Sequence, residues 1–521
     1  MANPNLILER FKTAKRIREN WENTWQEIFD YTMPGRDNLR VQSRGARRDD
    51  LVFDETAVVG VQEFASRMVQ GITPNNVKWA RLTPAPSIMN NLEPNDAAEI
   101  QEELDKATAQ VFDVIEASNF QQEAHEAFLD GALGTGSMVI QDGESMEPLN
   151  FHAVPISEVY LEAGPFDRID AQFRVRTPKA DDIKILWPKA SISSKLADII
   201  HNKPQTRIKL LEATMRNWDD PLITSHDHVV MDMSDKHVLF ETSWSGLGSC
   251  PWINFRWAKN PGEVWGRGPA YNALSAIKTC NLVVQLILEN AEMAITGVWQ
   301  ADDDGVINPA NVRLVPGAVI PRSINSRGLE PLSSPGNFDV AQLVLRDMRH
   351  NINKALYNET LGRREGTPIS ATEVSERMAE LSRQLGSTYG RLRTEFVDPV
   401  IQRVVYLLTR QGLVNLPGLP DGKEIKIIPT SPLSRAQRNE DITQHINFAQ
   451  VVGQLFGPAA IQTMLDPQKF TEQLAQWYEV SSQLLRDPQA QQMLGQQTGD
   501  AAAQMAAQGM DPVESLRAML P

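Results

Sequence analysis

The chain has 521 residues, and its 66 acidic against 51 basic side chains give a formal net charge of −15 at pH 7. That balance argues against a general nucleic-acid binder, whose affinity for DNA comes largely from cations that neutralise phosphates. The length allows three or four domains or subdomains, and two cysteines are too few for a disulfide framework or a zinc site.

The sequence predicts neither a signal peptide nor a membrane span. The opening residues, MANPNLILERFKTAKRIREN, lack an apolar h-region. The most apolar stretch, around residues 282–288, has an uncharged core of only about ten residues between Lys278 and Glu289, roughly half the length that crosses a bilayer. We therefore expect no membrane partner.

Four helices are predicted in the first part of the chain. Residues 5–32 are amphipathic, with six apolar side chains on one face: Ile7, Phe11, Ile17, Trp21, Trp25 and Ile28. Pro34 and Gly35 then break the pattern. Three further helices are expected, from near Asp54, over residues 95–117 and over residues 120–133.

Between residues 137 and about 257 the sequence changes to the two-residue period of strands. Residues 169–176 alternate apolar and polar side chains, which is typical of a half-buried strand. HVVMDMSDKHVLFET predicts a hairpin with Ser234, Asp235 and Lys236 at its turn, and a helix is expected over residues 179–186. We therefore predict an α+β fold that is predominantly helical.

Residues 270–295 predict a helix that is apolar nearly all round. Such a helix must be covered on most sides, by its own chain or by neighbouring subunits. A loop-rich insertion of about forty residues follows, with turn signals such as DDDG and SSPGN. A second helix is expected to begin near Phe338.

GTPISATEVSERMAEL, residues 366–381, joins a short Gly/Thr/Pro connection to a long helix. Ser370 and Glu373 have the spacing of a capping box, in which the two side chains satisfy free backbone amides of the first turn. Apolar residues then recur at steps of three and four. Pro399 lies inside this pattern, where its missing amide and its ring cost roughly 3 kcal/mol in a straight helix, so we expect a kink near residues 395–398.

The C-terminal part of the chain is less informative. KEIKIIPTSP predicts one strand, and residues 434–486 are expected to be helical again. The tail from Pro488 is rich in Gln, Ala and Met, which fits either a loose helix or disorder.

Three stretches suggest binding sites, but none carries a complete motif. The glycines of ALGTGSMVI, residues 132–140, lack dinucleotide-binding spacing and favour close backbone packing. ADDDGVIN, residues 301–308, lacks the ligand pattern of a calcium loop and favours a solvated acidic turn. His226 and His228 flank Asp227 without a third ligand, which favours surface hairpin residues over a metal site. We predict no catalytic residue, metal or cofactor.

Four stretches together carry a family resemblance. In chain order they are FDETAVVGVQEFASRMVQGITPNNVKWARLTP, ALGTGSMVI, PWINFRWAKNPGEVWGRGPA and SATEVSERMAEL. They resemble the head-to-tail connecting proteins, the portal proteins of short-tailed (podovirus-type) bacteriophages, over about residues 5–430. The resemblance implies a non-enzymatic portal: a ring-shaped channel at one capsid vertex of the virion, through which genomic DNA is packaged and ejected.

The resemblance also implies a portal fold and a set of partners. Its expected parts are a wing (1–265, with a β-rich part at 137–257), two stem helices (266–296 and 337–358), a clip (297–336), a tunnel loop (359–369), a long kinked helix (370–413), a return to the wing (414–430), and a crown with a low-complexity tail (431–521). The implied partners are further copies of the chain, usually twelve in all, duplex DNA passing without sequence specificity, the terminase packaging motor, tail adaptor proteins, the major capsid protein and a scaffolding protein.

The resemblance assigns candidate residues to two of these parts. The tunnel loop would face DNA with Leu361, Gly362, Arg363, Arg364, Glu365, Gly366 and Thr367, and the clip would bind partners through Asp302, Asp303 and Asp304. A largely acidic or neutral bore lets DNA slide, whereas a basic groove would hold it. Arg363 and Arg364 could therefore touch phosphates transiently or pair with acidic residues of the next subunit, with simple solvation as a third alternative.

Two other classes of protein remain as alternatives. A helical scaffold or interaction protein without a channel would also be acidic and would also carry a long helix with an internal proline. A nucleic-acid motor or nuclease is disfavoured because GLPDGKE lacks the glycine spacing of a phosphate loop and has no Ser or Thr after Lys423.

Overall fold

The computed structural model describes residues 3–36, 39, 50–75, 77–85, 94–143, 147–221, 223–296, 299–301, 329–331, 338–358, 383–416 and 425–434, with a few further positions between 447 and 454. The chain divides into two compact units. Unit one comprises Met1–Trp79, Val111–Val414 and Ser431–Leu433, and unit two comprises Ala80–Gln110, Asn415–Thr430 and Ser434–Pro521.

The fold is mixed α+β, and about half of the described residues are helical. The helices are α1 (Pro4–Thr32), η1 (Pro34–Arg36), α2 (Thr56–Ile72), α4 (Pro94–Ala117), α5 (Phe120–Leu133), α6 (Asp182–Leu186), α7 (Ser194–Asn202), α8 (Pro269–Thr296), α9 (Phe338–Ala355) and α11 (Asp398–Arg410). The first four long helices begin within a few residues of their predicted positions. α7 has no counterpart in the prediction, although Ser193 caps it by accepting a 3.3 Å hydrogen bond from the Leu196 amide.

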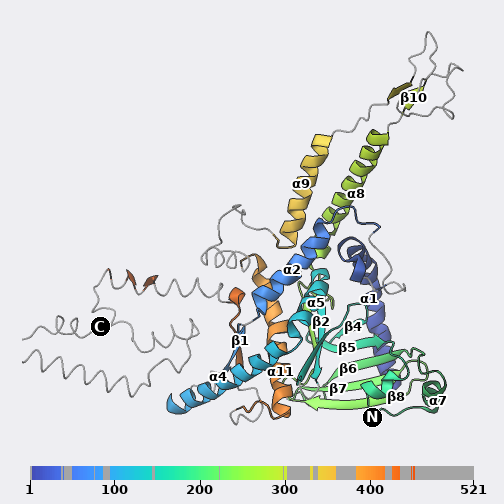
Figure 1. The fold of residues 1–521 in the computed structure, drawn as a ribbon. Helices are drawn as coiled ribbons and strands as arrows, with labels where there is room; N and C mark the ends of the chain where they lie inside the picture. Colours follow the sequence, from blue (N-terminus) through green and yellow to red (C-terminus); the bar gives the residue numbers. More distant parts are fainter. Residues whose placement is uncertain are drawn as a thin grey trace, which may run out of the picture. The chain divides into compact units, whose positions relative to one another are not determined.

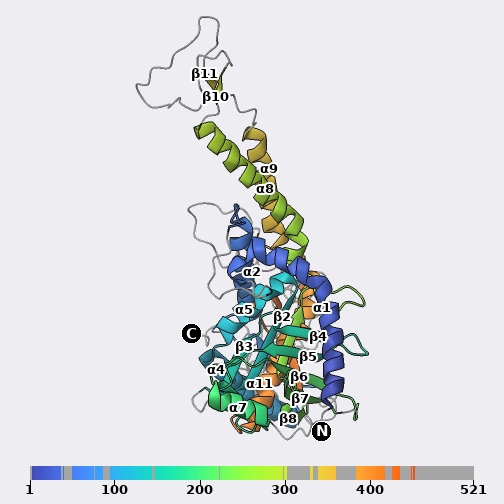
Figure 2. The same ribbon diagram turned by 90° about the vertical axis from the view of Figure 1, so that its right-hand side faces the viewer.

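A five-stranded antiparallel sheet forms the larger β part of unit one (Figure 1). Its order is β4 (Val159–Ala163), β5 (Ile169–Arg176), β6 (Leu210–Asn217), β7 (Ser225–Asp232) and β8 (Val238–Ser245). The predicted hairpin is confirmed: β7 pairs with β8, and Lys236 at the turn has φ 58°. α1 lies along one face of this sheet (Figure 2), where Phe11 makes an edge contact with Phe173 at 6.0 Å between ring centroids.

The second face of the sheet is also covered, which corrects the expectation of a half-buried strand. Ile183 of α6 and Leu196 of α7 pack against Leu210 and Val230 on this face. Gln172, predicted to face solvent, is 2% exposed and donates to the Cys250 Sγ at 3.3 Å. The alternating pattern of β5 therefore marks two different buried environments, one apolar and one polar.

His226 and His228 are buried as well, so their prediction as surface hairpin residues is wrong. Both project from β7 onto the polar face of the sheet. His226 Nδ1 lies 2.9 Å from the Ser249 hydroxyl, and His228 Nδ1 lies 2.9 Å from the Thr214 hydroxyl. Each imidazole has a polar partner on a neighbouring segment, and this partner makes its burial tolerable.

A smaller sheet of order β3-β2-β9 adjoins α5. It consists of β3 (Leu149–Ala153), β2 (Thr135–Asp142) and β9 (Trp252–Arg256), all antiparallel. The glycine-rich start of β2 packs closely against backbone, as its sequence predicts: a Cβ on Gly134, where φ is 143°, would lie 2.1 Å from the Gly266 carbonyl oxygen. This close approach requires glycine at position 134.

Pro399 lies where a helical run changes its hydrogen bonding. Residues 383–392 are helical, residues Arg393–Val397 form a π-helical segment, and α11 begins at Asp398 with Pro399 in its first turn. π-Helical insertions and prolines are both recognised causes of helix kinks. The kink near residues 395–398 stays a prediction.

The π-helical segment is anchored in the core of unit one. Phe396 is fully buried and contacts Phe128 of α5 and Phe255 of β9, with ring centroids 5.1 and 4.9 Å apart. Glu395 accepts three hydrogen bonds from Arg256, from its backbone amide at 2.9 Å and from Nε and Nη2 at 3.1 and 2.6 Å. Apolar and ionic contacts thus anchor two consecutive residues of this segment.

Unit two contains a two-stranded antiparallel ladder between segments far apart in the sequence. β1 (Ala80–Pro84) pairs with β12 (Ile425–Pro429), with Leu82 opposite Ile427. Arg81 donates two hydrogen bonds to Asp105 of α4, at 2.7 and 2.6 Å. The sequence predicts β12 as a strand but not its pairing with β1.

Among the described helices, none is both long enough and apolar enough to cross a membrane.

Candidate functional site

The predicted DNA-facing and partner-binding residues cannot be placed. Leu361, Gly362, Arg363, Arg364, Glu365, Gly366 and Thr367 lie outside the described residues, as do Ser370, Glu373 and Asp302, Asp303 and Asp304. Of the predicted site residues only Pro399 is described. The structure does describe the segments that flank these residues.

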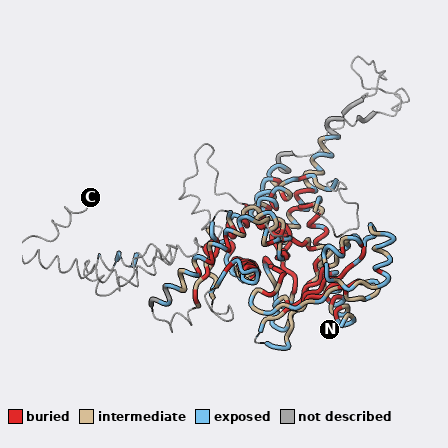
Figure 3. Tube along the Cα trace, turned by 60° about the horizontal axis from the view of Figure 1, so that its bottom comes forward, coloured by how far each residue is buried: buried red, intermediate tan, exposed pale blue. Residues whose placement is uncertain are grey.

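The helices α8 and α9 run side by side and flank the loop-rich insertion (Figure 1). Within the first half of α8 the buried residues include Ala273, Ile277 and Cys280. From residue 282 to residue 292 no side chain is classed as buried (Figure 3), and Leu282, Leu286 and Leu288 are each 53% exposed. The chain therefore covers one end of this apolar helix and leaves the other end largely uncovered.

A polar anchor ties the covered end of the pair to the segment before α2. Asn281 of α8 accepts hydrogen bonds from the amides of Phe53 and Asp54, at 2.7 and 3.1 Å, and donates to the Leu51 carbonyl at 2.8 Å. Arg349 of α9 donates to the Asp54 carboxylate at 2.9 and 2.7 Å. Burial alone would raise the pKa of Asp54, but hydrogen bonds from Thr56 and Arg349 lower it below the usual value.

The end of α9 is fixed by side-chain-to-backbone hydrogen bonds with α2. Tyr357 adopts the left-handed conformation with φ 58°, and Arg67 donates to its carbonyl at 3.0 Å. The Asn358 side chain donates to the Gly60 carbonyl at 2.6 Å, and the backbone N–H of Asn358 donates to the Asn353 carbonyl at 2.8 Å. This helix-terminating geometry sets the position and direction of the chain at residue 358.

A short ladder lies at the other end of the pair. β10 (Trp299–Ala301) pairs with β11 (Leu329–Pro331) in antiparallel register, with Gln300 opposite Glu330. This ladder brings together the two sides of residues 302–328.

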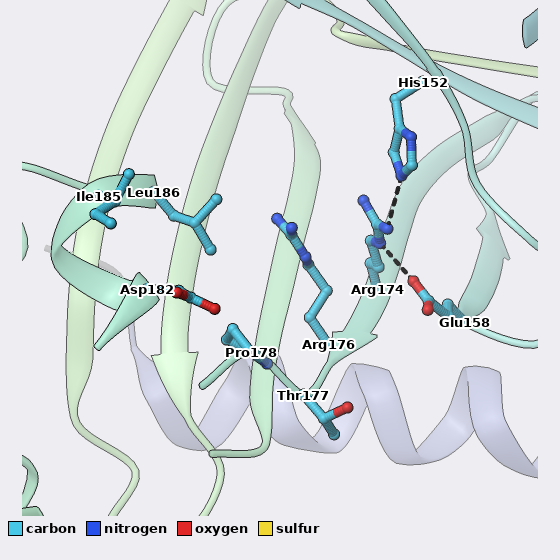
Figure 4. A pocket seen from close by; sticks show the side chains of 9 residues that line it. All are labelled: His152, Glu158, Arg174, Arg176, Thr177, Pro178, Asp182, Ile185 and Leu186. Atoms are coloured by element: carbon cyan, nitrogen blue, oxygen red, sulfur yellow. Dashed lines mark hydrogen bonds and ion pairs between the residues drawn. The ribbon is translucent and has the colours of Figure 1, made fainter. Parts of the chain in front are cut away.

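The polar face of the sheet holds a pocket that the sequence does not reveal (Figure 4). Its volume is about 440 Å³, and it is lined by His152, Glu158, Arg174, Arg176, Thr177, Pro178, Asp182, Ile185 and Leu186. Arg174 is 7% exposed; it donates to Glu158 at 2.8 Å, and its Nη2 lies 3.0 Å from His152 Nε2. The alternating pattern of β5 predicts that Arg174 and Arg176 face solvent. Only the tertiary packing reveals the pocket.

The pocket does not have the properties of a metal centre. Across the parts of the chain that are described, no three His, Cys, Asp or Glu side chains gather closely enough to hold a metal ion. Desolvation and the adjacent Arg174 lower the pKa of His152, so its ring is neutral at pH 7 and Nε2 accepts the arginine's hydrogen bond.

Arg403 is a second buried residue that sequence reasoning misses. It is 3% exposed and donates to the carbonyls of Ile140, Gly248 and Ser249, at 3.1, 3.2 and 3.0 Å. Burial lowers the pKa of Arg403 to about 10. Because it takes backbone carbonyls as partners, Arg403 joins α11 to β2 and to the loop before β9.

Comparison with known proteins places the chain in a family. The family described as bacteriophage head to tail connecting protein matches residues 5–485, so the chain belongs to it. Two curated relatives are a probable portal protein of Bordetella phage BPP-1, 23% identical over 557 residues (98% of this chain, 95% of the relative), and a portal protein of Salmonella phage epsilon15, 23% identical over 543 residues (96% and 94%).

A solved structure of a native gene transfer agent virion also aligns with the chain. The alignment covers 91% of this chain and 93% of that chain, with 11% identity and a TM-score of 0.34. The family match establishes a phage portal protein, or head-tail connector: a structural, non-enzymatic component of the virion. Membership implies an oligomeric ring.

Proposed function

We propose that this portal protein assembles as a dodecamer around a channel that carries duplex DNA during packaging and ejection, in a phage of the short-tailed type. The observation that carries the proposal is the uncovered end of α8. Its half-exposed Leu282 and Leu286 stand one helical turn apart, on one side of a helix whose other end is buried. Neighbouring copies in a ring would remove this apolar surface from water.

The described elements fit the parts of such a portal. In this proposal residues 1–265 form the wing, α8 and α9 the stem, and the β10–β11 ladder the base of a clip over residues 297–336. The clip would bind the terminase and later the tail adaptors, with Asp302, Asp303 and Asp304 as contacts. The wing and the crown, from residue 431, would meet the major capsid protein and the scaffolding protein.

The fixed end of α9 supports a role for the residues that follow it. The contacts of Tyr357 and Asn358 with α2 would hold the start of a tunnel loop over residues 359–369 at a constant place. In this proposal Arg363 and Arg364 touch DNA phosphates or pair with acidic residues of the next subunit, and the helix capped by Ser370 and Glu373 ends the loop.

Electron microscopy of the purified protein tests the ring. We expect rings with a central hole and twelve subunits; particles without a hole under every assembly condition would favour the alternative, a helical scaffold without a channel. Replacing residues 361–367 by a Gly/Ser linker tests the loop. Rings should still form while DNA packaging or retention falls, and normal packaging and retention would exclude the tunnel-loop assignment.

A further inference from the structure

The pocket between β5 and α6 lies in a part of the molecule to which the channel gives no role. Its volume of about 440 Å³ is within the range of roughly 300–1,000 Å³ that is typical of ligand-binding pockets. Its lining residues, labelled in Figure 4, come from β3 (His152), from the segment before β4 (Glu158), from β5 and the two residues after it (Arg174, Arg176, Thr177 and Pro178), and from α6 (Asp182, Ile185 and Leu186).

Hydrogen-bond donors gather at the floor of the pocket. Arg174 and Arg176 are two residues apart on β5, so they lie on one face of the strand, and Figure 4 shows their guanidinium groups pointing the same way. Arg174 contacts Glu158 and His152, and Arg176 donates to Glu212 at 3.1 Å. Among the described residues these contacts take three of the ten N–H donors that two guanidinium groups carry.

The rim of the pocket is apolar and exposed. Ile185 is 76% exposed and Leu186 is 39% exposed, although both belong to a helix whose Ile183 is fully buried. A small polar ligand on the floor would leave these side chains in water. A peptide segment could cover the rim and reach the floor at the same time.

We propose that this pocket docks a short peptide segment of another protein of the virion, in which an acidic side chain stands beside an apolar one. The carboxylate accepts hydrogen bonds from both Arg174 and Arg176, and the apolar side chain packs on Ile185 and Leu186. Glu158 and Glu212 already offset the two guanidinium charges, but the N–H donors that they leave free match carboxylate oxygens in geometry.

Asp182 provides a specific mutational test of this proposal. This carboxylate lines the pocket and makes no side-chain contact with either arginine within the described structure. It therefore repels an incoming carboxylate without holding the arginines in place. Asp182→Asn should tighten peptide binding about threefold or more, whereas Arg176→Gln should weaken it about tenfold.

The test uses the full-length protein and an array of overlapping 15-residue peptides that covers the structural proteins of its own virion. Peptides that bind are then synthesised, and their dissociation constants are measured by fluorescence anisotropy. We expect binders with Asp or Glu next to Leu, Ile or Val, and we expect the Glu→Gln or Asp→Asn form of each peptide to lose about tenfold in affinity.

Two further variants separate docking from folding. Ile185→Ser changes a side chain that is already in water, so it should weaken binding without changing thermal stability. Ile223→Ser is the matched control, because Ile223 is 50% exposed and lies in the β6–β7 connection, at the opposite end of the sheet by strand register. It should leave binding unchanged.

Three results would overturn the proposal. The first is that no array peptide binds better than its scrambled form. The second is that the binding peptides are indifferent to Arg176→Gln, Asp182→Asn and Ile185→Ser. The third is that the only binding peptides come from this chain itself. None of these results bears on ring formation, so the proposal and the portal function fail separately.

Discussion

The five-stranded sheet and the α8–α9 pair differ in how far the chain completes them. The sheet is covered on both faces, by α1 on one side and by α6, α7 and the segment around Cys250 on the other. The pair is covered at one end only, and Leu286 at the other end is 53% exposed. The chain thus completes the core around the sheet by itself, whereas the proposed ring would complete the pair, so mutations should act on folding in the sheet and on assembly in the pair.

Phe396→Ala should have the largest effect on folding, through the core that α5 and the three-stranded sheet share with the π-helical segment. Phe396 is fully buried between Phe128 and Phe255, and its removal leaves a cavity that the packed rings cannot fill. We expect a loss of about 3–5 kcal/mol in the free energy of unfolding, measured by urea titration at low protein concentration. Leu413→Ala is the control: that side chain is 51% exposed, and its truncation should cost less than about 0.5 kcal/mol. Equal losses would mean that the core is not where the structure places it.

Glu395→Gln should have the next largest effect. The substitution keeps the shape of the side chain but removes the charge that the buried Arg256 guanidinium faces, with side chains 20% and 5% exposed. We expect a loss of about 2–3 kcal/mol in the free energy of unfolding. Glu263→Gln, in the more exposed pair with Arg267, should cost less than about 1 kcal/mol by the same urea assay. A smaller loss for Glu395→Gln than for Glu263→Gln would contradict the assigned burial.

Much of the fold, but little of this difference, could be predicted from the sequence. The three-and-four spacing of apolar residues places α1 and α5, and the two-residue period places β5. Periodicity reports apolar faces only. A strand whose second face is buried against polar partners, as at Gln172, has the same pattern as one that faces water.

Buried charged residues could not be predicted from the sequence for a related reason. Arg256 and Arg403 are each surrounded by partners distant in the chain, such as Glu395 and the Ile140 carbonyl. A local sequence pattern contains no information about such distant partners, and by itself it predicts that an arginine side chain is exposed. The candidate site could not be predicted from residue patterns at all. The family resemblance alone implies the residues of the tunnel loop and the clip, and these lie outside the described residues.

The pH dependence of stability tests the five-stranded sheet itself, through His226 of β7. Burial, with Arg216 and Arg403 nearby, lowers the pKa of His226 from 6.5 to about 4. Below pH 6.5 the unfolded chain binds a proton that the folded chain refuses, so stability falls as the pH drops from 6.5 toward 4. The expected loss from this group is about 2 kcal/mol at pH 5. Urea titrations at pH 7 and pH 5 should show a smaller difference for His226→Gln than for the wild type; an unchanged difference would show that another group causes the slope.

Leu286→Ser should have the smallest effect on folding and a selective effect on assembly. The side chain already lies half in water, so the free energy of unfolding should change by less than about 0.5 kcal/mol. In a ring, however, the new hydroxyl would enter an apolar contact between copies, where an unpaired polar group is costly. Sedimentation velocity should therefore show rings at higher protein concentration than for the wild type, or no rings. Leu6→Ser on α1, at 54% exposure, is the matched control and should assemble normally. If Leu286→Ser assembled like the control, the uncovered end of α8 would be a surface tolerated in water, and the contrast with the sheet would lose its functional meaning.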